Sequence, residues 1–119
     1  MVVLIVDDEP DIAQALSLLL RDQGITVFTA LNGKEGLDVA GRVKPDVILV
    51  DLMMPVMDGL SFLDRISDVS SAVVVVMTGS KAPHPKYAVQ FVRKPFDPDR
   101  LIDIVLAAGG KNPIKVSES

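Results

Sequence analysis

Val-Val-Leu-Ile-Val-Asp-Asp-Glu-Pro (2–10) is the stretch that decides the fold. Five consecutive apolar residues end abruptly at three acids and a proline. A continuous apolar run of this kind is typical of a parallel strand that is covered on both faces. Proline suits the first position of a helix, so a helix is predicted to begin at Pro10, after Asp8 or Glu9. The stretch therefore predicts a buried strand, an acidic turn and a helix.

Similar apolar runs recur along the chain and alternate with helical patterns. The further predicted strands are 25–29, 46–50, 72–77 and 89–92. This alternation predicts one open α/β sheet with right-handed crossovers.

The predicted helices have readable ends and apolar faces. The first carries a stripe of Ile12, Leu16, Leu19 and Leu20 and ends at Gly24. Asn32 and Glu35 resemble a capping box for the second, and Asp58-Gly59 precedes the third, with Leu60, Leu63 and Ile66 on one face. The last begins at Asp97-Pro98, buries Leu101, Ile102, Val105 and Leu106, and ends at Gly109-Gly110.

The connection at 79–88 does not fit the pattern. It has ten residues and includes Pro83 and Pro85. A parallel crossover usually contains a helix and a dozen or more residues, and the prolines disfavour a regular helix. A loop is predicted there.

The composition limits the class of protein. With 119 residues, 49% of them apolar, the chain is expected to form one domain over 1–110, with a flexible tail at 111–119. The absence of cysteine excludes disulfides and thiolate zinc sites. A net charge of −4 argues against direct nucleic-acid binding. No apolar run approaches the length of a membrane span, so a cytoplasmic protein that does not contact membranes is expected.

Polar side chains follow four of the five predicted strands. They are Asp7, Asp8 and Glu9 after the first, Asp51 after the third, Thr78 after the fourth and Lys94 after the fifth. Ligands of open α/β sheets bind beyond the carboxyl ends of the strands, so these groups are expected to meet. Converging carboxylates suit Mg²⁺, or Mn²⁺, and a carboxylate held by metal and lysine can accept a phosphoryl group.

Each of these residues also has a purely structural alternative. Asp7 or Asp8 could cap the helix that begins at Pro10, and Asp51 could be a turn acid. Thr78 could cap a helix, and Lys94 could be a solvated surface lysine. A functional site is favoured because all of these groups stand together at strand ends.

The sequence resembles response-regulator receiver domains from Val2 to about Ala108. The matching motifs are Val-Asp-Asp-Glu-Pro (6–10), Asp-Leu-Met-Met-Pro-Val-Met-Asp-Gly (51–59), Met-Thr-Gly (77–79) and Lys-Pro-Phe (94–96). The resemblance implies an α/β, flavodoxin-like, doubly wound fold with a five-stranded parallel sheet in the order 2-1-3-4-5. It also implies that the family's fourth helix is short or absent here, since its segment is shortened and broken by proline.

The resemblance assigns a role to each motif residue. Asp51 is the expected phosphoacceptor; Asp8 binds Mg²⁺ directly, Asp7 through water, and Met53 through its carbonyl oxygen. Thr78 and Lys94 hold the phosphoryl group, and a cis Lys94–Pro95 bond aims the lysine into the site. Phe91 matches the aromatic switch that responds to Thr78.

Three functions compete on this sequence. The leading one is a stand-alone, non-enzymatic receiver that takes phosphate from a histidine kinase or phosphotransfer protein and switches the binding of a downstream protein. The second is a metal-dependent phosphohydrolase, and the third is a degenerate receiver that binds partners without phosphate.

The segment 79–88 is shorter than in the family and broken by proline, which affects the contacts expected with other proteins. A monomer or a weak dimer is expected, without the family's usual symmetric face. Ile104 and Ala108 on the last helix could meet a partner instead. Ala13, Leu16 and Leu20 are expected near a kinase-docking surface.

Overall fold

The computed structural model of the protein describes residues 1–51, 59–66, 68–78, 90–93 and 97–110. Met53, Lys94, Pro95 and the tail 111–119 lie outside these residues. So does the connection between residues 78 and 90, and the expectation that it contains no regular helix stays a prediction.

Five parallel strands form one sheet in the order β2-β1-β3-β4-β5, as expected. The strands are β1 (Val2–Val6), β2 (Thr26–Ala30), β3 (Val47–Asp51), β4 (Val73–Thr78) and β5 (Gln90–Arg93). The helices are α1 (Pro10–Arg21), α2 (Gly33–Val43), α3 (Gly59–Ile66) and α4 (Pro98–Ala108). The last four strands begin and end one residue later than the sequence predicted.

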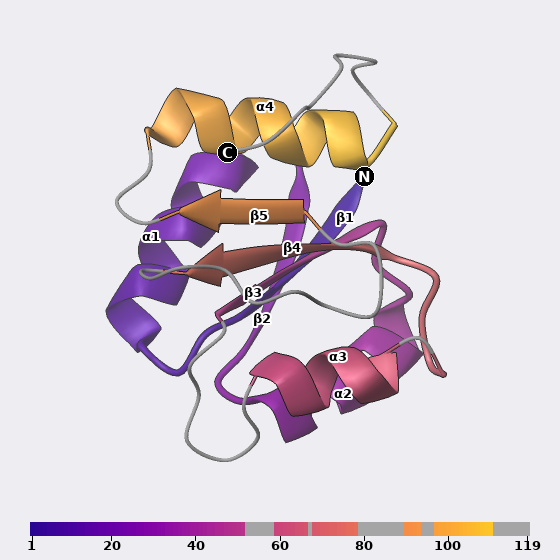
Figure 1. The fold of residues 1–119 in the computed structure, drawn as a ribbon. Helices are drawn as coiled ribbons and strands as arrows, with labels where there is room; N and C mark the ends of the chain where they lie inside the picture. Colours follow the sequence, from indigo (N-terminus) through magenta and orange to yellow (C-terminus); the bar gives the residue numbers. More distant parts are fainter. Residues whose placement is uncertain (52–58, 67, 79–89, 94–96, 111–119) are drawn as a thin grey trace.

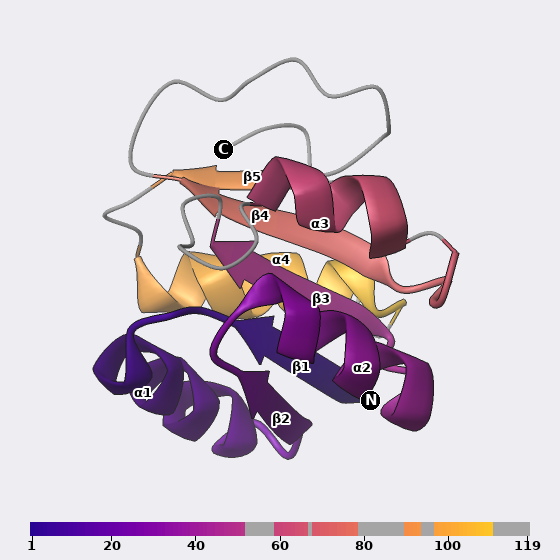
Figure 2. The same ribbon diagram turned by 90° about the horizontal axis from the view of Figure 1, so that it is seen from below.

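Helices cover both faces of the sheet (Figure 1). On one face Val3, Ile5, Val47 and Leu49 pack with α1 and α4. On the other face the alternate residues Leu4, Val6, Ile48 and Val50 pack with α2 and α3. Figure 2 shows the helices that cover the two faces in a view turned by 90°, with α2 and α3 together on one side of the sheet. Because both faces are buried, the inner strands β1, β3 and β4 need no polar alternation, which explains their continuous apolar runs; the edge strand β2 exposes Thr26 and Thr29.

Helix α1 is rotated relative to the stripe predicted for it. Leu16 and Leu20 are buried as expected, but Ile12 is 37% exposed, and Ala13 and Ser17 take the remaining core positions. The side chains of Ala13, Leu16 and Leu20 are all buried against the sheet, and the expectation that they lie near a kinase-docking surface stays a prediction.

Helix α2 begins with the predicted cap, in a modified form. The Glu35 amide donates to Asn32 Oδ1 (2.8 Å), as in a capping box. The Glu35 carboxylate, however, accepts from the Leu31 amide (2.8 Å) and not from the amide of Asn32 itself. Asn32 therefore fixes the start of the helix by satisfying one of its free amides.

We expect Asn32→Ala to lower the free energy of unfolding by about 1 kcal/mol, because the Glu35 amide loses its acceptor. Asn32→Asp keeps a side-chain oxygen and serves as the matched control. Urea unfolding of the three proteins measures the difference. Equal stability of the alanine and wild-type proteins would show that the cap contributes nothing.

Helices α2 and α3 approach closely on their shared face of the sheet. A Cβ added at Gly36 would lie 2.9 Å from Val6 Cγ2 and 3.1 Å from Phe62 Cε1. Phe62 is fully buried there, and Ile66 is buried as predicted. Leu60 and Leu63 were predicted for the same apolar face, but their side chains are not among those that the structure describes.

Helix α4 begins as predicted, with the Asp99 amide donating to Asp97 Oδ1 (3.0 Å). Leu101, Ile102 and Val105 are buried as predicted. The expectation that Ile104 meets a partner is wrong, because that side chain is only 2% exposed and belongs to the core. Ala108 is half-buried against the same core, and Leu106, predicted as a core residue, is only partly buried.

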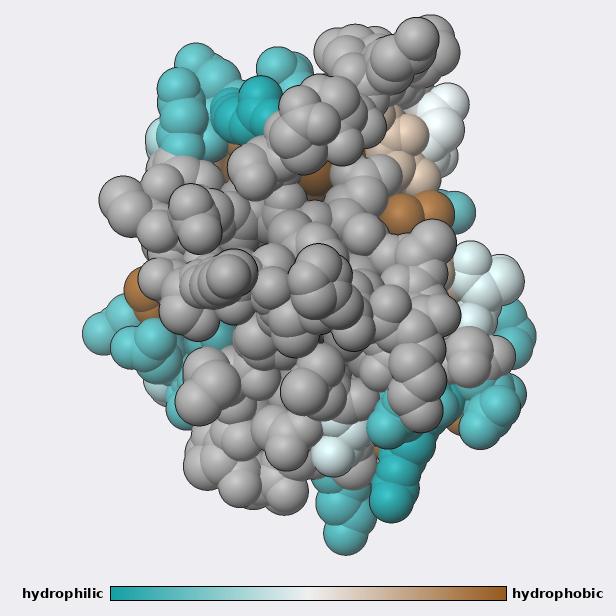
Figure 3. All heavy atoms as spheres, viewed as in Figure 1, coloured by the Kyte–Doolittle hydropathy of each residue, from teal (hydrophilic) through white to brown (hydrophobic). Residues whose placement is uncertain are grey.

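Exposed apolar side chains are scattered over several elements. Among the residues whose exposure the structure describes, the large ones are Ile12, Leu18, Leu31, Val69 and Val73. On the face drawn in Figure 3 the described atoms are mostly hydrophilic, with apolar residues in separate spots. Among the described residues, none of the helices combines the length and the hydropathy needed to cross a membrane.

Candidate metal and phosphoryl site

The acids of the site stand at the carboxyl edge of the sheet because of the strand register. Val6 pairs with Val50, so the next residues, Asp7 and Asp51, come side by side on neighbouring strands. The Asp7 amide also donates to the Ala30 carbonyl (3.0 Å), which continues the pairing of β1 with β2. The register thus brings together two acids that lie 44 residues apart in the sequence.

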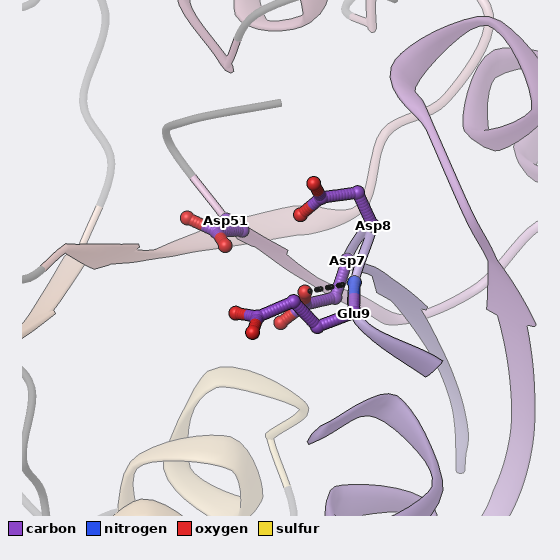
Figure 4. Close-up of side chains that lie close together, drawn as sticks. All are labelled: Asp7, Asp8, Glu9 and Asp51. Carbon is purple, nitrogen blue, oxygen red and sulfur yellow. Dashed lines mark hydrogen bonds between the residues drawn. The ribbon is translucent and has the colours of Figure 1, made fainter. Parts of the chain in front are cut away.

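Four carboxylates converge at this edge. Asp7, Asp8, Glu9 and Asp51 each offer one oxygen, and these oxygens all lie within 4.8 Å of one another. Figure 4 shows the four side chains turned toward the same space. Asp7 is fully buried and Asp51 is 6% exposed, whereas Glu9 is exposed. The predicted meeting of Asp7, Asp8, Glu9 and Asp51 is found, although the resemblance gave Glu9 no role in metal binding.

The helix-capping alternative for Asp7 and Asp8 is wrong. The N-cap of α1 is Glu9, and its side chain makes no capping hydrogen bond. Asp7 instead accepts a hydrogen bond from the Glu9 amide at Oδ1 (2.9 Å), which holds the acidic turn together. The positions of these aspartates follow from the strand end and not from the needs of the helix.

The charges in the cluster favour a cation. Two unit charges about 4 Å apart repel by roughly 4 kcal/mol at an effective dielectric constant of 20, and burial strengthens the repulsion. A divalent ion offsets this repulsion. Oxygen donors of this kind are the ligands that Mg²⁺ and Mn²⁺ prefer, so the residues present fit a hard cation.

The other predicted residues are placed only in part. Asp51 pairs with Met77, so Thr78, the last residue of β4, lies one position further along the same edge. Thr78 pairs with Arg93, the last residue of β5, and Lys94 follows it in the sequence. Phe91 pairs with Val76 within the sheet. The side chains of Thr78 and Phe91, like Met53, Lys94 and Pro95, lie outside the description.

Fold and site together define the class of protein: a flavodoxin-like α/β protein with a cluster of carboxylates at the carboxyl edge of its sheet. The family model of the response regulator receiver domain matches residues 3–106. The chain belongs to this family.

Solved receiver domains have the same fold. Chemotaxis protein CheY4 of Vibrio cholerae superposes with a TM-score of 0.81 at 33% identity, covering 90% of this chain and 97% of that one. A CheY-like receiver domain protein of Methanospirillum hungatei gives a TM-score of 0.83 at 31% identity, covering 92% and 94%.

Curated relatives are longer proteins. The DNA-binding response regulator MtrA of Mycolicibacterium smegmatis is 30% identical over 98% of this chain, which spans 54% of MtrA. A protein-glutamate methylesterase/protein-glutamine glutaminase of Anaeromyxobacter dehalogenans is 39% identical over 73% of this chain and 25% of that protein. The shared part is the receiver domain. Receiver domains are signalling phosphoacceptors, with an acidic Mg²⁺ pocket, that act between a phosphodonor protein and a downstream effector.

Proposed function

We propose that this chain is a Mg²⁺-dependent phosphorylation switch with Asp51 as its acceptor. The observation that carries the proposal is the position of Asp51: it ends a buried strand, is 6% exposed, and has a carboxylate oxygen within 4.8 Å of those of Asp7 and Asp8. A carboxylate in such a place is shielded from bulk water yet lies at the edge where ligands bind.

The chemistry requires a nucleophile and neutralisation of charge. An oxygen of Asp51 attacks the phosphorus of a phosphohistidine; the phosphorus–nitrogen bond breaks, and its electron pair stays on the imidazole. Asp8, Asp51 and the Met53 carbonyl would hold Mg²⁺ directly and Asp7 would hold it through water, and the bound ion would supply positive charge to the phosphoryl oxygens. Later, water attacks the phosphorus and restores the carboxylate with release of inorganic phosphate.

The remaining residues have positioning roles in the proposal. The Thr78 hydroxyl donates to one phosphoryl oxygen, and the Lys94 ammonium neutralises another. The end of β4 beside Asp51 supports the assignment of Thr78, since its backbone reaches the same edge. Phe91 is proposed as the aromatic switch that follows Thr78.

The proposed partners are a histidine kinase or phosphotransfer protein as donor and one downstream protein as target. The chain is proposed to be monomeric or weakly dimeric and to catalyse only its own phosphorylation and dephosphorylation. The runner-up function, a phosphohydrolase with an outside substrate, would use the same carboxylates.

Removal of the metal is expected to abolish phosphorylation. In acetyl phosphate with Mg²⁺, intact-mass measurement should show a phosphate-sized gain; with excess EDTA the rate should fall by at least about 100-fold, because the clustered carboxylates then repel the donor. Mn²⁺ should restore the gain. An undiminished gain in EDTA contradicts the proposed role of the metal.

The same preparation separates the two leading functions. A switch releases phosphate only as fast as its own aspartyl phosphate decays, because each turnover passes through Asp51. Steady hydrolysis of a generic phosphatase substrate such as p-nitrophenyl phosphate, far above that decay rate, would favour the phosphohydrolase.

A further inference from the structure

Glu9 is the acid of the cluster that the proposed phosphoryl transfer does not use. It occupies the N-cap of α1, where short side chains such as Ser, Thr, Asp and Asn are preferred because their oxygens reach the first helical amides. Glu9 makes no such bond. One of its carboxylate oxygens instead lies within 4.8 Å of oxygens of Asp7, Asp8 and Asp51.

Two backbone hydrogen bonds hold Glu9 beside the carboxylate cluster. Its amide donates to Asp7 Oδ1 (2.9 Å), and its carbonyl accepts from the Ala13 amide (3.0 Å) in the first turn of α1. The side chain therefore starts from a fixed point beside the aspartates. Figure 4 shows its carboxylate beside that of Asp7, on the side of the turn that faces Asp51.

We propose that Glu9 determines the cation specificity of this cluster by supplying a fourth carboxylate. The inference rests on the proposed function, since it concerns the cation that the phosphorylation site binds. A fourth negative charge strengthens the binding of every divalent cation. It strengthens the binding of larger cations more, because these accept more protein oxygens.

The coordination habits of the two cations support this preference. Mg²⁺ holds its ligands at about 2.1 Å, so oxygens on opposite sides of the ion are about 4.2 Å apart. Ca²⁺ holds its ligands at about 2.3–2.6 Å, which separates opposite oxygens by roughly 4.6–5.2 Å. The four oxygens here lie within 4.8 Å of one another, so one divalent cation can contact all four, and Ca²⁺, which takes six to eight oxygen ligands, accepts the fourth carboxylate more readily than Mg²⁺. Mg²⁺ at the aspartates keeps its waters toward Glu9, since it dehydrates reluctantly.

Glu9 acts in opposite directions on the cation-free and the cation-bound protein. Without a cation it adds a fourth charge to a cluster whose other acids include the buried Asp7 and Asp51, and this repulsion destabilises the fold. With a cation it adds attraction. A residue that served only the structure of the turn would change both states in the same direction.

Isothermal titration calorimetry with Mg²⁺, Mn²⁺ and Ca²⁺ tests the proposal on the full chain. Glu9→Gln removes the charge and keeps the shape. Asp11→Asn is the matched control, because Asp11 is an exposed acid of the first turn of the same helix and is not among the four clustered acids. Both variants lose one charge near the helix N-terminus.

We expect Glu9→Gln to weaken Ca²⁺ binding about tenfold and Mg²⁺ binding about threefold, and Asp11→Asn to change either by less than about twofold. In EDTA the Tm of Glu9→Gln should exceed that of Asp11→Asn; in Ca²⁺ the order should reverse. Equal affinities in the two variants, or an equal weakening of Mg²⁺ and Ca²⁺ by Glu9→Gln, would overturn the proposal.

Phosphorylation of the same variants distinguishes this inference from the proposed function. If Glu9→Gln binds cations as Asp11→Asn does and Asp51 is still phosphorylated, only the role of Glu9 is wrong. If the wild-type chain binds no divalent cation and gains no phosphate, both are wrong.

Discussion

Asp51→Asn is expected to reduce phosphorylation by acetyl phosphate and Mg²⁺ at least about 1,000-fold, because the neutral amide is a very poor nucleophile. Asparagine has almost the shape of aspartate, so the buried end of β3 should retain its packing. Intact-mass measurement over time gives the phosphorylated fraction directly. The variant should also bind Mg²⁺ more weakly, since one of the clustered carboxylates is lost.

Asp46→Asn is the matched control for this change. Asp46 directly precedes β3 at the opposite edge of the sheet, where its Oδ2 accepts from the Val2 amide (2.8 Å). Loss of its charge should leave phosphorylation unchanged. A phosphate-sized gain in Asp51→Asn at the wild-type rate would show that another residue accepts the phosphoryl group.

Phe62→Ala is expected to lower the free energy of unfolding by about 3–5 kcal/mol, since it removes a fully buried ring and leaves a cavity. The ring packs in the core between α2, α3 and the sheet, next to the close approach at Gly36. Domains of this size are stable by about 5–15 kcal/mol, so the variant should retain only a fraction of that stability. Urea unfolding followed by circular dichroism measures the change.

Two controls define what the loss means. Phe62→Leu fills most of the space and should cost clearly less than Phe62→Ala. Leu18→Ala removes a side chain that is 59% exposed on α1 and should cost less than about 1 kcal/mol. If Phe62→Ala costs no more than Leu18→Ala, the packing described for α3 is wrong.

Strand positions could be predicted because this sheet is covered on both faces. Strands β1, β3 and β4 are runs of Val, Ile, Leu and Met that stop where the chain leaves the core, as β1 does at Val6 before Asp7, whereas the edge strands β2 and β5 are more mixed. The later strands end one residue after the predicted position. In β3 and β4 the extra residue is polar, because Asp51 and Thr78 still pair with a neighbouring strand. Polarity marks the edge of the core, whereas hydrogen bonding continues one residue further.

Helix faces were predicted less well, because large apolar residues are not always the buried ones. Helix α1 buries Ala13 and Ser17 and leaves Ile12 partly exposed, since small side chains permit closer approach to the sheet. On α4, the sequence predicts that Ile104 meets a partner, but its side chain lies in the core. Side-chain size alone does not reveal which face of a helix meets the sheet.

The aspartates of the site could be predicted from topology, and Glu9 could not be assigned to the metal set. Parallel strands end at one edge, so Asp7 and Asp51 had to be neighbours once the strand order was known. The position of the Glu9 carboxylate depends on the backbone of the turn, which the hydrogen bond to Asp7 fixes. In the sequence, the one indication that Glu9 belongs to the site is that it directly follows Asp7 and Asp8 at the end of the strand.

Chemical trapping of the acceptor tests the central claim most directly. After incubation with acetyl phosphate and Mg²⁺, sodium borohydride reduces an aspartyl phosphate to homoserine, and peptide mass spectrometry locates the product. The account predicts homoserine at position 51, absent when EDTA replaces Mg²⁺. Homoserine at another aspartate, or phosphate retained on a residue that borohydride does not reduce, would contradict the assignment of Asp51 as the phosphoacceptor.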